Sequence, residues 1–235
     1  MLRITSSEER LVQDAEIKWL KRQNVLDNRG SFNFYITTDF ATSAKQTADF
    51  SVISVWAYTS NGDWIWVDGV MARQTMDKTV DDLFRLVQEY KPQQVGIEVS
   101  GQQGAFIQWL TNEMITRNIW FTFASSEKSG SAGIRPEQDK LKRFNVVVPW
   151  FKAGKIYFPE EMKRSIIMGL AIGQIKLATM SGLKGKDDFI DTVSMLGYLK
   201  PWKPSDSIAV TPTEIDRWDE DTRYEEPSGL ASYVV

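Results

Sequence analysis

The chain has 235 residues, a formal net charge of -3 from 28 basic and 31 acidic side chains, and 42% hydrophobic residues. These values are typical of a globular protein with a full-sized core and exclude a wholly disordered chain. The absence of Cys and His excludes disulfides, thiol nucleophiles, Ser-His-Asp triads and His-ligated zinc. No apolar run reaches the roughly 18 residues of a membrane span, and the N-terminal segment lacks the apolar stretch of a secretory signal.

The first half of the chain predicts a short helix followed by a three-stranded meander. A thin apolar stripe in residues 1–31 indicates a helix and linker. Strands are predicted from alternating, β-rich sequence over 32–39, 49–58 and 64–71. Between the last two, Ser60-Asn61-Gly62-Asp63 is an Asn-Gly hairpin turn. A helical spacing of apolar residues follows over 79–90 and ends at Lys91-Pro92.

The second half predicts strands that alternate with helices. Strands are predicted over 94–99, 119–123 and 155–158. Helices are predicted over 104–114, 137–148, 160–180 and 187–199. The element order predicts an α/β fold with a mixed five-stranded sheet, in which an antiparallel three-strand meander is joined by parallel strands and flanked by helices.

Acidic residues in apolar surroundings are the main functional signal. Asp39 ends a β-rich strand, Glu98 lies within the apolar segment QVGIEV, and the last helix opens with Asp187, Asp188 and Asp191. A carboxylate in such a place is costly unless it is paired, hydrogen-bonded or bound to a metal. Because the carboxyl ends of adjacent parallel strands meet at one edge of a sheet, we expect these acids to converge there.

Converging carboxylates favour a hard divalent cation such as Mg²⁺ or Mn²⁺, which prefers oxygen ligands. Two such ions about 3.5–4 Å apart hydrolyse phosphodiesters without any His. Each acid also has a simpler interpretation. Asp39 suits a turn acceptor or helix cap, Glu98 a solvent-facing glutamate, and Asp187 with Asp188 a capping and dipole pair. The metal site is inferred from all three placements together.

The ordered set of segments resembles the C-terminal nuclease domain of the large terminase subunit of tailed phages, within the RNase H-like superfamily. The matching segments are ITTDFA, TADFSVI, VGIEVSGQQG, KLKRF, FKAGKIYFP and KDDFID. The resemblance covers about residues 32–200. No single segment is specific, but their order is.

The resemblance implies a metal-dependent endodeoxyribonuclease that cleaves double-stranded viral DNA during genome packaging, with two Mg²⁺ or Mn²⁺ ions. It implies that Asp39, Glu98 and Asp188 bind the metal, with Asp187 as a fourth ligand. Which of the two adjacent aspartates is the main ligand stays open at this point. The secondary candidates are Asp49 and Asp191.

The sequence differs from the family pattern in two ways, and it contains a basic run that the resemblance assigns to DNA contact. Family members often have His before the paired aspartates, where this chain has Lys186. The basic residues implied to face the DNA backbone are Arg135, Lys140, Lys142, Arg143, Lys152 and Lys155. A solvated helix face with its lysine stems packed on the surface is the alternative interpretation. No GxxxxGK[ST] phosphate loop occurs, so we expect the packaging ATPase to lie outside this sequence.

The expected domains are a linker from a preceding motor domain over 1–31, the nuclease domain over 32–200 and an acidic tail over 201–235. Expected partners are double-stranded DNA, the ATPase motor domain, the portal and the small terminase subunit, in the host cytoplasm and away from membranes. Two rival functions remain. One is another RNase H-like nuclease, such as a junction resolvase or hybrid nuclease, and the other is a non-catalytic module that docks on portal or capsid.

Overall fold

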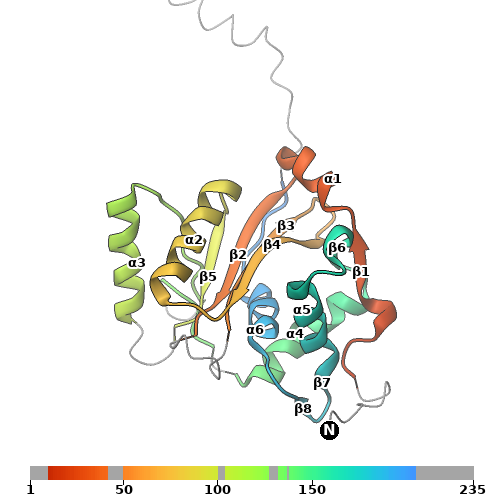
Figure 1. The fold of residues 1–235 in the computed structure, drawn as a ribbon. Helices are drawn as coiled ribbons and strands as arrows, with labels where there is room; N and C mark the ends of the chain where they lie inside the picture. The colour runs from red at the N-terminus through yellow and green to blue at the C-terminus, as the bar shows by residue number, and fades with distance from the viewer. Residues whose placement is uncertain (1–9, 42–49, 100–103, 127–131, 137, 205–235) are drawn as a thin grey trace, which may run out of the picture. The chain divides into compact units, whose positions relative to one another are not determined.

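A computed structural model describes residues 10–41, 50–99, 104–126, 132–136 and 138–204. Six strands form the main sheet, in the spatial order β1-β6-β4-β3-β2-β5 (Figure 1). The strands are β1 (Lys18–Leu20), β2 (Asn33–Asp39), β3 (Ser51–Tyr58), β4 (Trp64–Ala72), β5 (Gln94–Ile97) and β6 (Ile156–Pro159). The fold is therefore a mixed sheet of parallel and antiparallel strands, as expected.

Helices cover both faces of this sheet. They are α1 (Arg22–Asp27), α2 (Met76–Tyr90), α3 (Gly104–Arg117), α4 (Lys140–Lys152), α5 (Ile166–Leu177) and α6 (Asp188–Ser194). A two-stranded hairpin of β7 (Ala178–Thr179) and β8 (Gly182–Leu183) joins α5 to α6. Among the helices that the structure describes, none is both long and apolar enough to cross a membrane.

The directions of the strands define two edges of the sheet. β3 is antiparallel to β2 and β4, whereas β2–β5, β4–β6 and β1–β6 are parallel pairs. β3 alone therefore runs against the other five strands. The carboxyl ends of those five lie along one edge, which we call the carboxyl edge. The turn at residues 59–63 lies at the opposite edge, which we call the hairpin edge.

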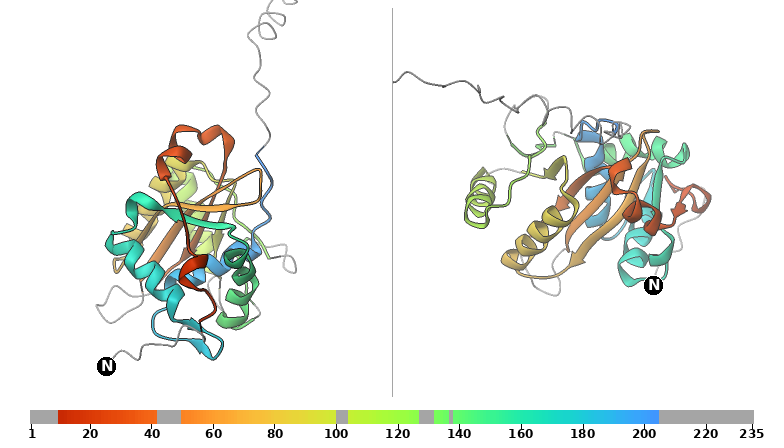
Figure 2. Two further views of the ribbon diagram at one scale, coloured as in Figure 1. Left: turned by 90° about the vertical axis from the view of Figure 1, so that its right-hand side faces the viewer. Right: turned by 90° about the horizontal axis from the view of Figure 1, so that it is seen from above.

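Two hydrophobic cores explain why the central strands are apolar on both faces. Tyr35 and Trp56 belong to the core shared with α4, α5 and α6. Phe34 and Ile36 belong to the core shared with α2 and α3. Successive side chains of a strand point to opposite faces, so β2 contributes to both cores. Figures 1 and 2 show the resulting three layers, with α2 and α3 on one side and α4, α5 and α6 on the other.

The sheet has six strands rather than the five predicted. Two strands join it beyond those expected: β1, which lies inside the segment predicted as a linker, and β6, predicted as a separate short strand over 155–158; the two pair in parallel. The predicted strand over 119–123 makes only an isolated bridge, Val95 to Phe123. Its backbone contacts with β5 are restricted to bonds from Val95 N to Thr122 O and from Ala124 N to Val95 O. Too few ladder bonds form for a full strand.

The helix predicted over 160–180 is shorter in the structure. A tight turn at Glu160–Met162 precedes it, and α5 begins after Ser165, whose side chain accepts a hydrogen bond from Met168 N. The helix ends at Leu177 because Ala178–Thr179 pairs with Gly182–Leu183 in a hairpin. The apolar run was continuous in sequence, but backbone pairing in the hairpin replaced its last helical turn.

Candidate active site

Asp39 and Glu98 lie next to each other at the carboxyl edge. Asp39 is the last residue of β2, and Glu98 directly follows β5. In the parallel ladder Thr38 is opposite Ile97, so the two acids occupy the next position on neighbouring strands. The Thr38 hydroxyl donates to the Gly96 carbonyl at 3.0 Å, which ties the two strand ends together. The predicted convergence of these two acids is therefore a property of the strand register.

The amino end of α6 adds further acids to the same edge. Asp188 and Asp191 are each only 2% exposed. The helix is fixed against the sheet by a buried bond between the Ser54 and Thr192 hydroxyls at 3.0 Å. Asp187 occupies the N-cap position but its side chain makes no capping hydrogen bond. The capping interpretation of Asp187 therefore does not describe this helix.

A residue from another helix caps α6 instead. The amide N–H of Phe189, in the first turn of α6, donates to Gln174 Oε1 of α5 at 2.7 Å. Gln174 is itself buried. Because an orphan N–H at a helix start must find an acceptor when it is buried, Gln174 supplies the cap that Asp187 does not. Sequence reasoning did not identify Gln174, since nothing local marks a cap supplied from a different helix.

The first turn of α4 brings two cations to the acids. Arg143 donates to Glu98 Oε2 at 2.8 Å and to Asp191 Oδ1 at 3.1 Å, and is 6% exposed. The Lys140 ammonium lies 2.6 Å from Asp191 Oδ2 and 3.0 Å from Asp187 Oδ1. Arg143 and Lys140 therefore link the acids of α6 to the acid that follows β5.

The surroundings of Asp39 change its ionisation. Burial, together with the charges of Asp191, Glu98 and Asp188, raises the pKa of Asp39 to about 8, and the charge of Lys140 opposes this shift. A buried carboxyl group among like charges resists ionisation unless a cation arrives. Strong perturbation of a carboxyl at a sheet edge is typical of functional sites.

The charged groups around Asp39 also shift the ionisation of one another. Burial raises the pKa of Asp191, against the attraction of Lys140 and Arg143. Burial opposes the charge of Lys140, but its bonds to Asp191 and Asp187 outweigh burial and raise its pKa. Asp191, Glu98, Lys140 and Arg143 therefore form one network of paired charges, as burial of a charge requires.

The donor chemistry of the site fits a divalent metal ion. Asp39, Glu98 and Asp188 present only carboxylate oxygens, the ligands that Mg²⁺ and Mn²⁺ prefer. In the described part of the chain, no three acidic side chains as placed could together hold an ion. In this arrangement Glu98 is bound to Arg143, and Asp191 is bound to both Arg143 and Lys140.

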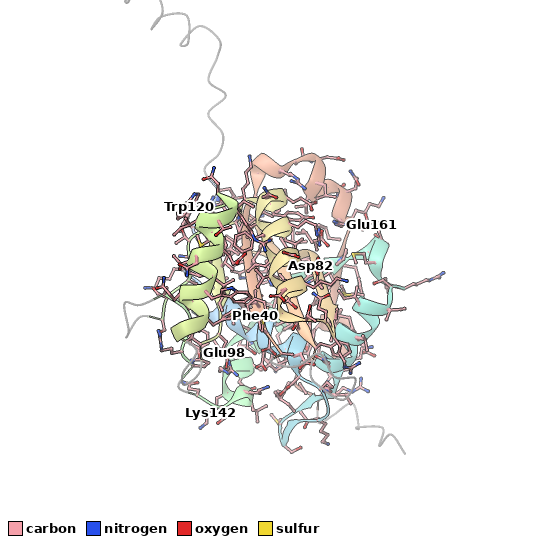
Figure 3. All side chains as sticks on the ribbon, turned by 60° about the vertical axis from the view of Figure 1, so that its left-hand side comes forward. Phe40, Asp82, Glu98, Trp120, Lys142 and Glu161 are labelled. Carbon is pink, nitrogen blue, oxygen red and sulfur yellow. The ribbon has the colours of Figure 1, made fainter. Side chains whose placement is uncertain are left out.

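The predicted DNA-contacting residues do not form one surface. Lys142 lies in the first turn of α4 near the acids, with a side chain 70% exposed, and Figure 3 shows it at the same end of the molecule as Glu98. Arg135 also lies near the carboxyl edge, since its neighbour Ile134 bridges to Glu98. Lys155 instead binds Asp63 at the hairpin edge.

Two further assignments differ from the expectation. Lys152 ends α4, about 18 Å along the helix from Lys140. Arg143 was expected to face DNA but is buried, and its guanidinium binds two carboxylates on separate elements. Asp49 lies outside the described residues. Its role as a secondary ligand stays a prediction.

No protein-family model and no curated protein matches the chain. Several solved structures are similar to it in fold. The human cytomegalovirus terminase nuclease domain, soaked with Mn and bound to an inhibitor, is 14% identical with a TM-score of 0.57, over 80% of this chain and 94% of that one.

Two bacterial-virus structures are similar in the same way. The large terminase nuclease from thermophilic phage G20c with bound magnesium is 15% identical with a TM-score of 0.51, over 80% of this chain and 96% of that one. The nuclease domain of the large terminase subunit gp2 of bacterial virus Sf6 is 9% identical with a TM-score of 0.53, over 82% of this chain and 100% of that one. The chain therefore has the RNase H-like fold of terminase nuclease domains.

Proposed function

We propose that this chain is a divalent-cation-dependent endonuclease that hydrolyses double-stranded viral DNA during genome packaging. The observation that carries the proposal is the convergence of Asp39, Glu98 and Asp188 at the carboxyl edge of a terminase-nuclease fold. Solved neighbours of this fold contain magnesium or manganese. We extend that property to this chain because its own acids offer only oxygen donors.

Asp39, Glu98 and Asp188 would hold the metal ions in this proposal. Bound divalent ions would supply an activated water and stabilise the leaving oxygen of the cleaved phosphodiester. The raised pKa of Asp39 means that this carboxyl releases a proton when a cation is bound near neutral pH. Arg143 holds the Glu98 carboxylate by a charge-assisted hydrogen bond.

Among the acids of α6 we assign Asp188 as the principal ligand. Asp191 links Lys140 to Arg143, which suits a residue that organises the site, and Asp187 precedes the helix and binds Lys140. Asp188 is buried at the start of the helix, and its charge acts on Asp39. We therefore propose that Asp191 organises the site and that Asp187 is a subsidiary ligand.

The exposed cations near the carboxyl edge would hold the DNA backbone. Lys142 and Arg135 are suited to this task by position, and contacts with phosphate oxygens orient a duplex without reading its sequence. We propose that the working assembly contains the ATPase motor, portal and small terminase subunit in the host cytoplasm. We also propose a linker from the motor over 1–31, whose β1 adds to the sheet, a nuclease domain over 32–200 and an acidic tail over 201–235.

The test is nicking of supercoiled plasmid in Mn²⁺, Mg²⁺ or EDTA. We expect metal-dependent cutting by the wild type. Asp39→Asn and Asp188→Asn should each lose more than about a hundredfold in rate, beyond the losses typical of residues that only support metal ligands. Asp63→Asn is the matched control, since Asp63 lies at the hairpin edge with Lys155, and it should cut normally.

Two results would argue against the proposal. Cutting that persists in EDTA would exclude the metal-dependent mechanism, and equal losses in all three variants would exclude the assigned site. Linear duplex, four-way junction and RNA–DNA hybrid substrates compared in the same assay separate a packaging nuclease from the other RNase H-like activities. A folded protein that never cuts and never binds metal would favour the non-catalytic docking function.

A further inference from the structure

The acid cluster contains its own cations, and they differ in how firmly they are held. Arg143 is 6% exposed and binds carboxylates from two separate elements at 2.8 and 3.1 Å. The Lys140 side chain is 48% exposed and binds Asp191 and Asp187, both from the start of α6. The guanidinium is therefore enclosed, whereas the ammonium borders solvent on a flexible stem.

We infer that Lys140 is an internal counter-ion that competes with divalent cations for this site, while Arg143 is a positioning residue that holds Glu98 and Asp191 in place. The inference rests on the proposed metal-dependent function and concerns the regulation of the same site. It assigns opposite effects to two cations that sequence analysis had grouped together as contacts for DNA.

The geometry explains why Lys140 would compete. A single ammonium lies on two of the three acids supplied by α6, at 2.6 and 3.0 Å. Its charge also acts on Asp39, where it opposes the repulsion from the neighbouring acids. A divalent cation entering this site would find oxygens of Asp191 and Asp187 already bound to Lys140. It would also be repelled by the ammonium, because Coulomb repulsion over a few ångströms is weakly screened in a partly buried place.

Arg143 has the opposite task. Glu98 lies beyond the end of β5, where the ladder with β2 no longer fixes the backbone. The backbone of Glu98 bridges to Ile134, and the bond from Arg143 to Glu98 Oε2 fixes its side chain. The second bond of Arg143, to Asp191, joins Glu98 to α6. Removal of this guanidinium would take from Glu98 its bond to Arg143 and leave Asp191 with Lys140, so the two carboxylates would no longer be linked.

Metal affinity without DNA tests the inference independently of activity. Mn²⁺ binding is measured by calorimetry and by the loss of the free-ion electron paramagnetic resonance signal. We expect Lys140→Gln to bind Mn²⁺ about tenfold more tightly than the wild type, since one like charge is removed. Lys140→Arg keeps the charge and should stay near the wild-type affinity. Arg143→Gln should bind more weakly.

Controls separate competition from general effects of charge and folding. Lys78→Gln removes an exposed charge from the first turn of α2, and it should leave Mn²⁺ affinity unchanged. Thermal unfolding in EDTA establishes that each variant is folded. For Arg143→Gln, rescue of Mn²⁺ affinity by Arg143→Lys would support a positioning charge even if the Gln variant is unstable.

The outcomes distinguish this inference from the proposed function. If the wild type binds Mn²⁺ and Lys140→Gln binds it equally or less tightly, the inferred role of Lys140 is wrong. The nuclease proposal is unaffected by that result. Absence of Mn²⁺ binding in both proteins overturns the metal site and this inference together. Binding by Lys140→Gln alone supports the strongest form of the inference, in which Lys140 blocks the site.

Discussion

The raised pKa of Asp39 results from its position in the fold. It ends β2 beside Glu98 and opposite the acids of α6, so burial and like charges act on one carboxyl together. An aspartate at an exposed strand end would titrate near its ordinary value. The same residue destabilises the metal-free fold and, in the proposed function, would bind a cation; such a perturbed carboxyl is typical of functional sites.

This cost predicts a pH dependence of stability. The folded pKa of Asp39 is about 8 against an ordinary value of 3.8, so the folded state binds the extra proton between those values. Stability of the metal-free protein should therefore fall as the pH rises from about 4 to about 8. Asp39→Asn removes this loss and should raise the unfolding midpoint in EDTA at pH 8 by about 2–6 °C.

Thermal unfolding of the wild type and Asp39→Asn at pH 5 and pH 8, in EDTA, checks this prediction. The difference between the two proteins should shrink toward pH 5, where the wild-type carboxyl is protonated as well. A difference of the same size at both pH values would mean that the substitution acts through packing and not through ionisation.

At the level of elements, α6 depends on α5 for its start. Gln174 accepts the hydrogen bond from Phe189 N at 2.7 Å, and this bond fixes where the helix begins. The Ser54–Thr192 bond then fixes the helix against β3. Asp187, Asp188 and Asp191 are positioned through these two contacts, so α5 influences the site without touching it.

Gln174→Leu is expected to weaken both the fold and the site. The change leaves the buried Phe189 N–H without its acceptor, which should lower the free energy of unfolding by about 1–3 kcal/mol. Denaturant unfolding measures this loss, and Mn²⁺ titration should show weaker binding as the α6 acids lose their fixed position. Gln108→Leu on the exposed face of α3, where the bond to Asn112 is at the surface, should change neither quantity.

In the folded molecule, basic residues that are close in the sequence lie at opposite edges of the sheet. Lys142 and Lys155 are thirteen positions apart in the chain, but α4 carries the backbone from the carboxyl edge to the hairpin edge between them. A duplex bound over the acids would reach the first turn of α4 and leave the hairpin edge uncovered. The surface proposed to bind DNA is therefore smaller than the basic run suggests.

Duplex binding should distinguish the two lysines. Lys142→Gln is expected to weaken binding of an inactive Asp188→Asn protein to duplex DNA by a few-fold, and to reduce the slope of log affinity against log salt by about 1. Lys155→Gln should change neither value. Fluorescence anisotropy across a salt series measures both, and equal effects of the two substitutions would place DNA along the full length of α4.

The order of elements and the spacing of apolar residues determined much of this protein in advance. Alternation over β2 to β4, the Asn-Gly turn and the apolar segment before Glu98 each specify local backbone structure. Strand direction then predicts that Asp39 and Glu98 meet, because neighbouring parallel strands end together. The expected fold was confirmed, although with six strands instead of five.

Tertiary structure alone decided which charges meet which. Arg143 reaches Glu98 across 45 positions and Asp191 across 48, and Gln174 caps a helix 15 positions away. Periodicity reports which face of an element is buried, but it carries no information on the partner of a buried polar group. The pairing of α4 with α6, set by packing in the core they share, turned an apparent DNA contact into a buried support for the acids.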